Sequence, residues 1–258
     1  MGDSVSGKAT EVSLIGLTGL PEVRAGDDLG TLIVEAVSSL GLAFRPGDVL
    51  VVTQKVVSKA EGRVVSLRDV AASPLAQSWA ALLAKDPRLI ELILREARRI
   101  VRMDRRVLLA ETQHGFICAN AGVDRSNLPD QEVAALLPLD PDASAKAIRE
   151  QILALCQTEV AVLISDTFGR PWREGLTNVA IGVSGLLPLR DYSNAGDDFG
   201  RLLTATIIAV ADELAAAAEL VMGKTKRIPA ALIRGYEYAT GEGRASMLLR
   251  PPEQDLFR

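Results

Sequence analysis

Two aspartates that follow apolar runs are the residues best suited to chemistry in this sequence. Asp166 and Thr167 come directly after the run "AVLIS". Asp124 and Asn127 lie in the small-residue segment "CANAGVDRSN". Carboxylate, hydroxyl and amide oxygens suit hard cations such as Mg²⁺, and an acidic residue after a buried strand often holds Mg²⁺ in phosphoryl-transfer enzymes. The alternative is that both segments are ordinary turns, since Asp, Asn, Ser and Gly are common turn residues.

A third polar segment carries positive charge. The apolar run "VLVV" leads into "TQKVVSKAEG", residues 53–62, which contains Gln54, Lys55 and Lys59. Ligands bind beyond the carboxyl ends of strands in open α/β sheets, and lysine ammonium groups can pair with phosphate oxygens. The alternative is a solvated turn with surface lysines, because such charges are normally exposed.

Two arginines lie in the loop that we expect after Thr167. Arg170 and Arg173 flank Trp172 in "GRPWREG" and could hold a carboxylate or a phosphate through paired hydrogen bonds. The alternative is that Asp166 caps the next turn and that both arginines are surface residues. We therefore treat Arg170 and Arg173 as candidate substrate-binding residues.

Together, the aspartates and lysines of separate segments predict a site for a metal and a nucleoside phosphate. Mg²⁺ and Mn²⁺ usually keep several waters and bind one or two carboxylates plus substrate phosphates, so few protein ligands suffice. The only histidine is His114, and neither of the two cysteines is in a CxxC pair. This argues against His-rich zinc sites, a Ser-His-Asp triad and a disulfide framework. We expect His114 to be a hydrogen-bonded turn residue.

The composition limits the class of protein. With 258 residues, of which 48% are hydrophobic, the chain can form one large domain or two small ones around a sizeable core. A net charge of −4 argues against nucleic acid as a partner. The N-terminus lacks the pattern of a signal peptide, and the longest apolar stretch is interrupted by Asp212, Glu213 and Glu219. We therefore expect a cytoplasmic protein that does not bind a membrane.

Helical and strand patterns alternate along the chain, which predicts an α/β or α+β fold with a mixed sheet. Caps and apolar spacing predict helices at residues 29–40, from 74, 87–99, 142–156 and 202–222. Apolar runs predict strands at residues 12–17, 49–53, 106–112, 115–122, 159–165, 178–185 and 229–235.

Several segments together resemble the coenzyme F-420-0:L-glutamate ligase (F-420-0:gamma-glutamyl ligase) family. They run in order from about residue 19 to 235, and their combination is far more specific than any single one. The family also occurs fused to a nitroreductase-like domain, and we expect the standalone form here. The matching segments are "GLPEVRAGDDL", "GDVLVVTQKVVSKAEGR", "HGFICANAGVDRSN", "LLPLDPDASA", "SDTFGRPWREG" with "VAIGVSG", and "ADELAAAAELVMGK" with "PAALIRG".

The resemblance implies a GTP-dependent ligase that adds L-glutamate to the deazaflavin precursor coenzyme F-420-0 through an acyl phosphate. The first glutamate is joined by its α-amino group and later ones through γ-linkages. The implied cofactors are Mg²⁺ or Mn²⁺, expected as two ions, and K⁺. The implied architecture is an intertwined homodimer of an unusual, family-specific α+β fold. Residues 1–258 would form a single ligase domain that could divide into two subdomains.

The resemblance also assigns site residues. Asp124 and Asp166 match metal ligands, and Thr167 matches a contact to a second metal. Lys55 or Lys59 would stabilise charge that develops on phosphate, and no residue is identified as a general base. The loop "GKTKRIP", which begins at Gly223, is shorter and more basic than the glycine- and acid-rich loop of archaeal members. The residues matched to GTP contacts are Leu20, Pro21, Glu22, Val23, Gln54, Lys55, Lys59, Asn127, Gly223 and Thr225.

Two other functions remain open from the sequence. A metal-dependent nucleotide phosphohydrolase could use the same aspartates without an amine acceptor. A non-catalytic nucleotide-binding subunit could keep the fold, although it would have no need of both carboxylates. The sequence also leaves open the choice between GTP and ATP and the number of glutamates added.

Overall fold

A mixed sheet forms the centre of the protein in the computed structural model, which describes residues 10–104, 107–128, 130–193, 195–197, 199–203 and 206–255. The strand order is β1-β12-β2-β8-β9, in which β2 and β8 are parallel and the other neighbours are antiparallel. The strands are β1 (Ser13–Gly16), β12 (Ala230–Arg234), β2 (Val49–Thr53), β8 (Ala161–Arg170) and β9 (Arg173–Ser184).

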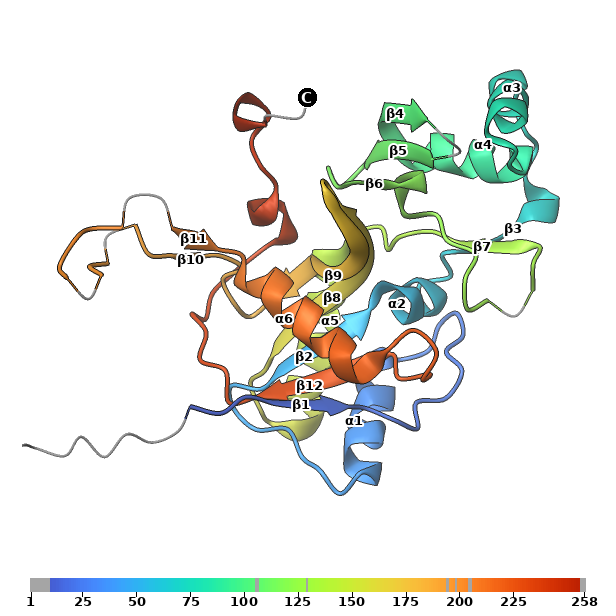
Figure 1. Ribbon diagram of the computed structural model, residues 1–258. Helices are drawn as coiled ribbons and strands as arrows, with labels where there is room; N and C mark the ends of the chain where they lie inside the picture. Colours follow the sequence, from blue (N-terminus) through green and yellow to red (C-terminus); the bar gives the residue numbers. More distant parts are fainter. Residues whose placement is uncertain are drawn as a thin grey trace, which may run out of the picture.

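Helices cover both faces of this sheet. Helix α6 (Val210–Met222) crosses one face and packs against β9, β12 and β1, while α5 (Pro141–Cys156) packs against β8 and β9 and supports α1 (Leu29–Ser39) (Figure 1). Because β2 is covered on both faces, Val49–Val52 are fully buried, which explains the continuous apolar run in the sequence. Gly182 permits the close approach of α5, since a Cβ there would lie 2.3 Å from the Pro141 carbonyl oxygen.

A second group of elements has its own buried cluster, which includes Leu67, Ile90, Ile93 and Leu108. The small strands β3 (Val64–Ser66) and β7 (Val133–Ala135) pair with each other, and β5 lies between β4 and β6. The remaining elements are α2 (Gln54–Ala60), α3 (Pro74–Leu83), α4 (Pro87–Glu96), β4 (Ala97–Asp104), β5 (Val107–Thr112), β6 (Ile117–Ala119), β10 (Arg190–Asp191), β11 (Ile207–Ile208) and the short 3₁₀ turns Leu67–Asp69, Asn120–Gly122, Ala245–Leu248 and Pro252–Gln254.

Side-chain caps place most helix starts where the sequence predicted them. The side chains of Asp28, Ser73, Asp86 and Asp140 accept hydrogen bonds from backbone N–H groups of the first turns of α1, α3, α4 and α5. A proline follows each of the last three caps, at a position where its missing N–H costs nothing. The prediction of a mixed sheet packed with helices is confirmed. The intertwined dimer and the family-specific character of the fold stay predictions.

The prediction of a loop after Thr167 is wrong. Strand β8 continues through Asp166 and Thr167 to Arg170, and the chain returns as β9 from Arg173. Trp172, with a φ of 55°, completes the tight turn of this long hairpin. The polar residues do not end the strand, because this part of it is only half-buried and pairs with β9 through backbone hydrogen bonds.

Three other boundaries differ from the sequence prediction. The segment after β2 is helix α2 rather than a solvated turn, and it buries Gln54 and Ser58. The helix expected to reach residue 99 ends at Glu96, because the following residues pair with β5 as an edge strand. The helix expected at residues 202–222 begins only at Val210, although residues 204–205 of that range lie outside the described residues. In the described part of the chain, no helix is long and apolar enough to cross a membrane.

Candidate active site

The parallel pairing of β2 with β8 brings two of the predicted segments together where β2 ends. Thr53, the last residue of β2, pairs with Ser165 in β8. The chain beyond Thr53 enters α2 with Lys55, and the chain beyond Ser165 continues with Asp166. Ligands bind beyond the carboxyl ends of parallel strands in open α/β sheets, so the end of β2 beside Asp166 is a candidate ligand site.

Asp124 reaches the same place from the segment after β6. Its backbone bridges to Ala135, and its Oδ2 accepts a hydrogen bond of 2.6 Å from Lys55 Nζ. Ser126 donates its backbone N–H and its hydroxyl to the same carboxylate, at 2.8 and 2.7 Å. Burial opposes ionisation of Asp124, but the hydrogen bonds from Lys55 and Ser126 outweigh it and hold the pKa of Asp124 below its usual value. Asp124 is therefore an ionised carboxylate with a fixed cation.

Asp166 has the opposite electrostatic environment. Burial raises its pKa to about 6, and the negative charge of Asp124 acts in the same direction. The backbone N–H of Thr167 and the charges of Lys55 and Lys224 lower the pKa only in part. Among the described residues, Asp166 forms no direct ion pair comparable to that of Asp124 with Lys55. Its carboxylate is thus incompletely compensated and would gain from a bound cation.

Thr167 is held with its oxygen lone pairs available. Its hydroxyl donates to Asn178 Oδ1 at 2.7 Å, across the β8–β9 hairpin, and Asn178 Nδ2 donates to Glu219 of α6 at 3.2 Å. Because the hydroxyl proton is engaged with Asn178, the oxygen can accept from a cationic group, and Lys224 Nζ donates to it. This orientation is also the one that a metal contact through Thr167 would need.

The donor set fits a hard divalent cation. Asp124, Asp166 and Thr167 offer carboxylate and hydroxyl oxygens, which suit Mg²⁺ or Mn²⁺ better than softer metals. In the part of the chain that the structure describes, no three His, Cys, Asp or Glu side chains gather as a metal cluster. An ion held here would therefore need waters and substrate phosphates to complete its coordination, as is usual for Mg²⁺.

The residues matched to the first nucleotide contacts lie beside α2. Lys59 Nζ forms an ion pair of 2.5 Å with Glu22, and the backbone N–H of Gly26 donates to the Ala60 carbonyl at 2.8 Å. These contacts bring the segment with Leu20, Pro21, Glu22 and Val23 against the helix that carries Gln54, Lys55 and Lys59. Val23 and Gln54 are buried, and Gln54 Oε1 accepts from Ser58, so packing accounts for part of what these two side chains do.

The remaining predicted residues lie in other loops. Asn127 is exposed, with a φ of 54°, three residues after Asp124. Gly223 ends α6, its N–H bonded to the Glu219 carbonyl at 2.9 Å, and exposed Thr225 follows in the same loop as Lys224. His114 Nε2 contacts the carbonyl oxygens of Pro138 and Leu139 at 2.9 and 3.1 Å, which confirms a hydrogen-bonded histidine.

Arg170 and Arg173 do not join this cluster. Arg170 lies four residues beyond Asp166 on an extended strand, roughly 13 Å along it. Its guanidinium donates to the Glu174 carbonyl at 2.7 Å, within the turn of the hairpin. Both arginines and Trp172 are exposed at the hairpin tip. A substrate-binding role for them at these carboxylates of the same chain is not supported by their position.

Sequence reasoning missed Lys224, Ser126, Asn178 and Glu219. The basic loop at residues 224–227 was a signal for Lys224, but nothing in the sequence singled it out from its neighbours. Asn178 meets Thr167 only because β8 and β9 pair in the observed register, with a bulge opposite Ser165. Such a contact depends on register and bulge position, which the sequence pattern did not determine.

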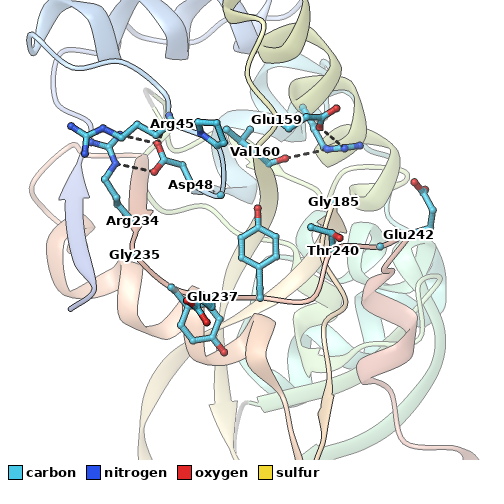
Figure 2. Close-up of a pocket in the computed structure, with 16 residues that line it drawn as sticks. Arg45, Asp48, Glu159, Val160, Gly185, Arg234, Gly235, Glu237, Thr240 and Glu242 are labelled. Atoms are coloured by element: carbon cyan, nitrogen blue, oxygen red, sulfur yellow. Dashed lines mark hydrogen bonds and ion pairs between the residues drawn. The ribbon is translucent and has the colours of Figure 1, made fainter. Parts of the chain in front are cut away.

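A pocket of about 760 Å³ lies at the other end of the central strands, near the amino end of β2 (Figure 2). Asp48, which precedes β2, is fully buried there and accepts two hydrogen bonds from Arg234, of 2.9 and 2.8 Å. Arg149 forms an ion pair of 2.6 Å with Glu159 in the same pocket. None of the residues predicted to bind metal or GTP lines this pocket.

Comparison with known proteins identifies the family. The sequence profile described as F420-0:Gamma-glutamyl ligase matches residues 18–235. The Coenzyme F420:L-glutamate ligase of Methanothermobacter thermautotrophicus is 47% identical over 250 residues, which cover 96% of this chain and 99% of that protein. The protein of the same name from Methanopyrus kandleri is 45% identical over 92% of this chain and 94% of its own length, and that from Methanocaldococcus jannaschii is 41% identical over 96% and 97%. The chain therefore belongs to the F420-0:Gamma-glutamyl ligase family.

Proposed function

We propose that this protein is a GTP-dependent ligase that joins L-glutamate to the coenzyme F-420-0 precursor through an acyl phosphate, in coenzyme F-420 biosynthesis. The observation that carries the proposal is the convergence of Asp124, Asp166 and Lys55, from three separate segments, near the carboxyl end of β2. The membership of the family supports glutamate and coenzyme F-420-0 as substrates.

The proposed reaction has two steps. A carboxylate oxygen of the precursor bonds to the γ-phosphorus of GTP, and the bond from this phosphorus to the bridging oxygen breaks, so that GDP leaves. The amino nitrogen of glutamate then bonds to the acyl carbon, and the carbon–oxygen bond to phosphate breaks. Inorganic phosphate leaves with the electron pair, and the amine proton passes to water or phosphate.

The chain contributes positioning and charge to these steps. Asp124 and Asp166 would hold Mg²⁺ or Mn²⁺, and Thr167 would contact a second such ion; when bound, these ions would supply positive charge opposite the phosphates. Lys55 and Lys59 lie next to this end of β2 on α2 and would stabilise charge on the phosphoryl oxygens, where fixed cations lower the barrier most. A second divalent ion and K⁺ belong to the same proposal. The free thiols of Cys118 and Cys156 agree with a cytoplasmic setting.

The same proposal includes a homodimer. The segment that carries β10 and β11 projects away from the central sheet (Figure 1). On it, Phe199, Leu202 and Ile207 expose 86%, 68% and 54% of their surfaces, and exposed apolar side chains that gather in one segment favour a contact with another protein surface. We expect light scattering to give the mass of a dimer for the wild type and of a monomer for Leu202→Asp. A monomeric wild type would contradict this part of the proposal.

Mass spectrometry of the products tests the function. The purified protein is incubated with precursor, glutamate, GTP and Mn²⁺, and we expect products heavier by whole glutamate residues, with one GDP formed per residue added. Omission of the precursor or of glutamate separates ligation from the alternative of a phosphohydrolase. Phosphate release that is equally fast without either acceptor would overturn the ligase in favour of hydrolysis. Binding of GTP with no turnover would favour a non-catalytic subunit.

A further inference from the structure

A second pocket lies between the small sheet of β4, β5 and β6 and the C-terminal segment, residues 248–255. Its volume is about 600 Å³, which is in the range of pockets that hold a small organic molecule. Gly115 lets the two parts approach closely, since a Cβ there would lie 2.9 Å from a methyl carbon of Leu249. None of the residues predicted to bind metal or GTP lines this pocket.

Three arginines give the second pocket a positive lining. Arg98 and Arg99 are neighbours in β4, where regular alternation would direct them to opposite faces. A bulge in the pairing of β4 with β5 lets both reach the buried carboxylate of Glu111, at 3.6 and 2.6 Å. Arg250 comes from the C-terminal segment and has no ion-pair partner among the described residues. Three guanidinium groups thus face two carboxylates, those of Glu111 and Asp255.

The apolar part of the lining limits the kind of ligand. Side chains of Ile117, Leu248, Leu249, Pro251 and Pro252 line the pocket together with the arginines. A guanidinium group stacks on planar rings and also donates hydrogen bonds to ligand oxygens. The lining therefore suits a planar organic molecule that carries oxygen acceptors, and the volume exceeds what glutamate or phosphate alone would fill.

The second pocket lies close enough to Asp166 for one long substrate to reach both. Phe168 follows Asp166 by two residues in β8, so the two side chains point to the same face of the sheet, roughly 7 Å apart along the strand. The ring centre of Phe168 is 6.3 Å from that of Phe116. The Phe116 ring is 5.6 Å from the ring of His114, which lines the pocket.

We propose that the second pocket binds the deazaflavin ring of the coenzyme precursor while the reacting carboxylate of the precursor lies beside Asp124 and Asp166. The carboxylate that becomes phosphorylated must be at the candidate active site, so the ring at the opposite end of the molecule lies away from it. Arg250 donates to the carbonyl oxygens of the ring, and Ile117 contacts its apolar face. This assignment rests on the proposed function, since it takes coenzyme F-420-0 as the substrate.

The fluorescence of the deazaflavin ring, followed as protein is added to the precursor, provides the test. Arg250→Ala should weaken binding of the precursor about tenfold, because a charged hydrogen-bond donor is lost while Glu111 keeps Arg98 and Arg99 as partners. Arg102→Ala is the matched control, since Arg102 is on β4 and 70% exposed but does not line the pocket. We expect the wild-type affinity for this control, and an unchanged affinity for a fluorescent GTP analogue in both variants.

A bulky side chain and a shortened ligand give two further readouts. Ile117→Trp fills the pocket from a position that is already 38% exposed. It should weaken the precursor by about tenfold or more without lowering the thermal unfolding midpoint. A deazaflavin that lacks the carboxylate-bearing side chain should compete with the precursor for the wild type and should lose affinity in the same two variants.

Wild-type affinity of both pocket variants for the precursor would overturn the inference. A loss confined to products that already carry glutamate, with the ring-only ligand unaffected, would also overturn it and assign the arginines to the glutamyl tail. If the wild type ligates glutamate while both variants bind the precursor normally, only the pocket assignment fails. If the wild type binds the precursor in a manner sensitive to Arg250 but adds no glutamate to it, the proposed ligase fails and the pocket assignment does not.

Discussion

The central strands β2 and β8 carry an aspartate beside basic side chains near each end of β2. The negative charge of these two aspartates is balanced in different ways. At the amino end of β2, buried Asp48 accepts two hydrogen bonds from Arg234 and a third of 2.8 Å from the backbone N–H of Arg45. In the middle of β8, close to the carboxyl end of β2, Asp166 has the N–H of Thr167 and only the more distant charges of Lys55 and Lys224.

This difference separates a structural ion pair from a site prepared for a ligand. A buried carboxylate that is paired with a guanidinium has its charge balanced, and removal of one partner of such a pair is strongly destabilising. A carboxylate with an incompletely balanced charge costs stability in the empty protein and is characteristic of functional sites. Removal of each aspartate should therefore affect a different property.

The largest effect is expected from Asp166→Asn. The substitution keeps the size of the side chain and removes the charge that would hold the metal against the phosphates. Glutamate-dependent GDP formation should fall by about 10³-fold, as it does when one preorganised electrostatic group is lost. The thermal unfolding midpoint serves as the control and should not fall. Activity within a few-fold of the wild type would show that Asp166 is not part of the reaction centre.

Asp48→Asn should produce the reverse pattern. Arg234 would keep its buried charge without a partner, so we expect the free energy of unfolding to fall by about 3 kcal/mol. Urea denaturation measures this loss. At low temperature, where the variant is folded, its kcat/KM should stay within about twofold of the wild-type value, because Asp48 lies away from the candidate site. A variant of normal stability with strongly reduced kcat/KM would place chemistry at the Asp48 end of β2 instead.

The stability of the metal-free protein should depend on pH because of the raised pKa of Asp166. The folded pKa of about 6 lies above the unfolded value, so the folded state binds more protons between about pH 4 and 6. The contribution of Asp166 to stability is therefore present below about pH 4 and is lost as the pH rises through 6. Urea unfolding of chelator-treated protein should show this decline, and Asp166→Asn should remove it. An identical decline in the variant would assign the effect to another group.

The sequence predicted the elements of the sheet better than their lengths. The caps Asp28, Ser73, Asp86 and Asp140 act locally, and the helices that they start are found where they were expected. The ends of α4 and β8 depend on which strand pairs with the residues beyond them. Strand pairing is a tertiary property. The polar side chains of Asp166 and Thr167 therefore did not indicate that β8 continues through them.

The candidate site could also be predicted only in part from the sequence. Asp124, Asp166 and Lys55 follow apolar runs in the sequence, and their convergence follows from the parallel pairing of β2 with β8 and from the contact of Lys55 with Asp124. Lys224 and Asn178 were not predictable, because they reach Thr167 through the loop after α6 and the register of the hairpin. The sequence also gave no indication that Arg170 would be carried away along an extended strand.

The smallest effect is expected at the ion pair of Glu22 with Lys59, which lies between the two extremes. Glu22 is 58% exposed and Lys59 is 13% exposed, so water reaches the pair from the side of Glu22 and screens its attraction. Glu22→Gln should change the free energy of unfolding by less than about 1 kcal/mol, measured by urea denaturation. Lys59 would then be free to turn toward bound phosphate, and the affinity for a fluorescent GTP analogue should stay equal to that of the wild type or rise slightly. A loss of affinity with unchanged stability would mean that the Glu22 carboxylate itself contacts the nucleotide or positions Lys59 for it, and that this exposed pair belongs with Asp166 rather than with Asp48.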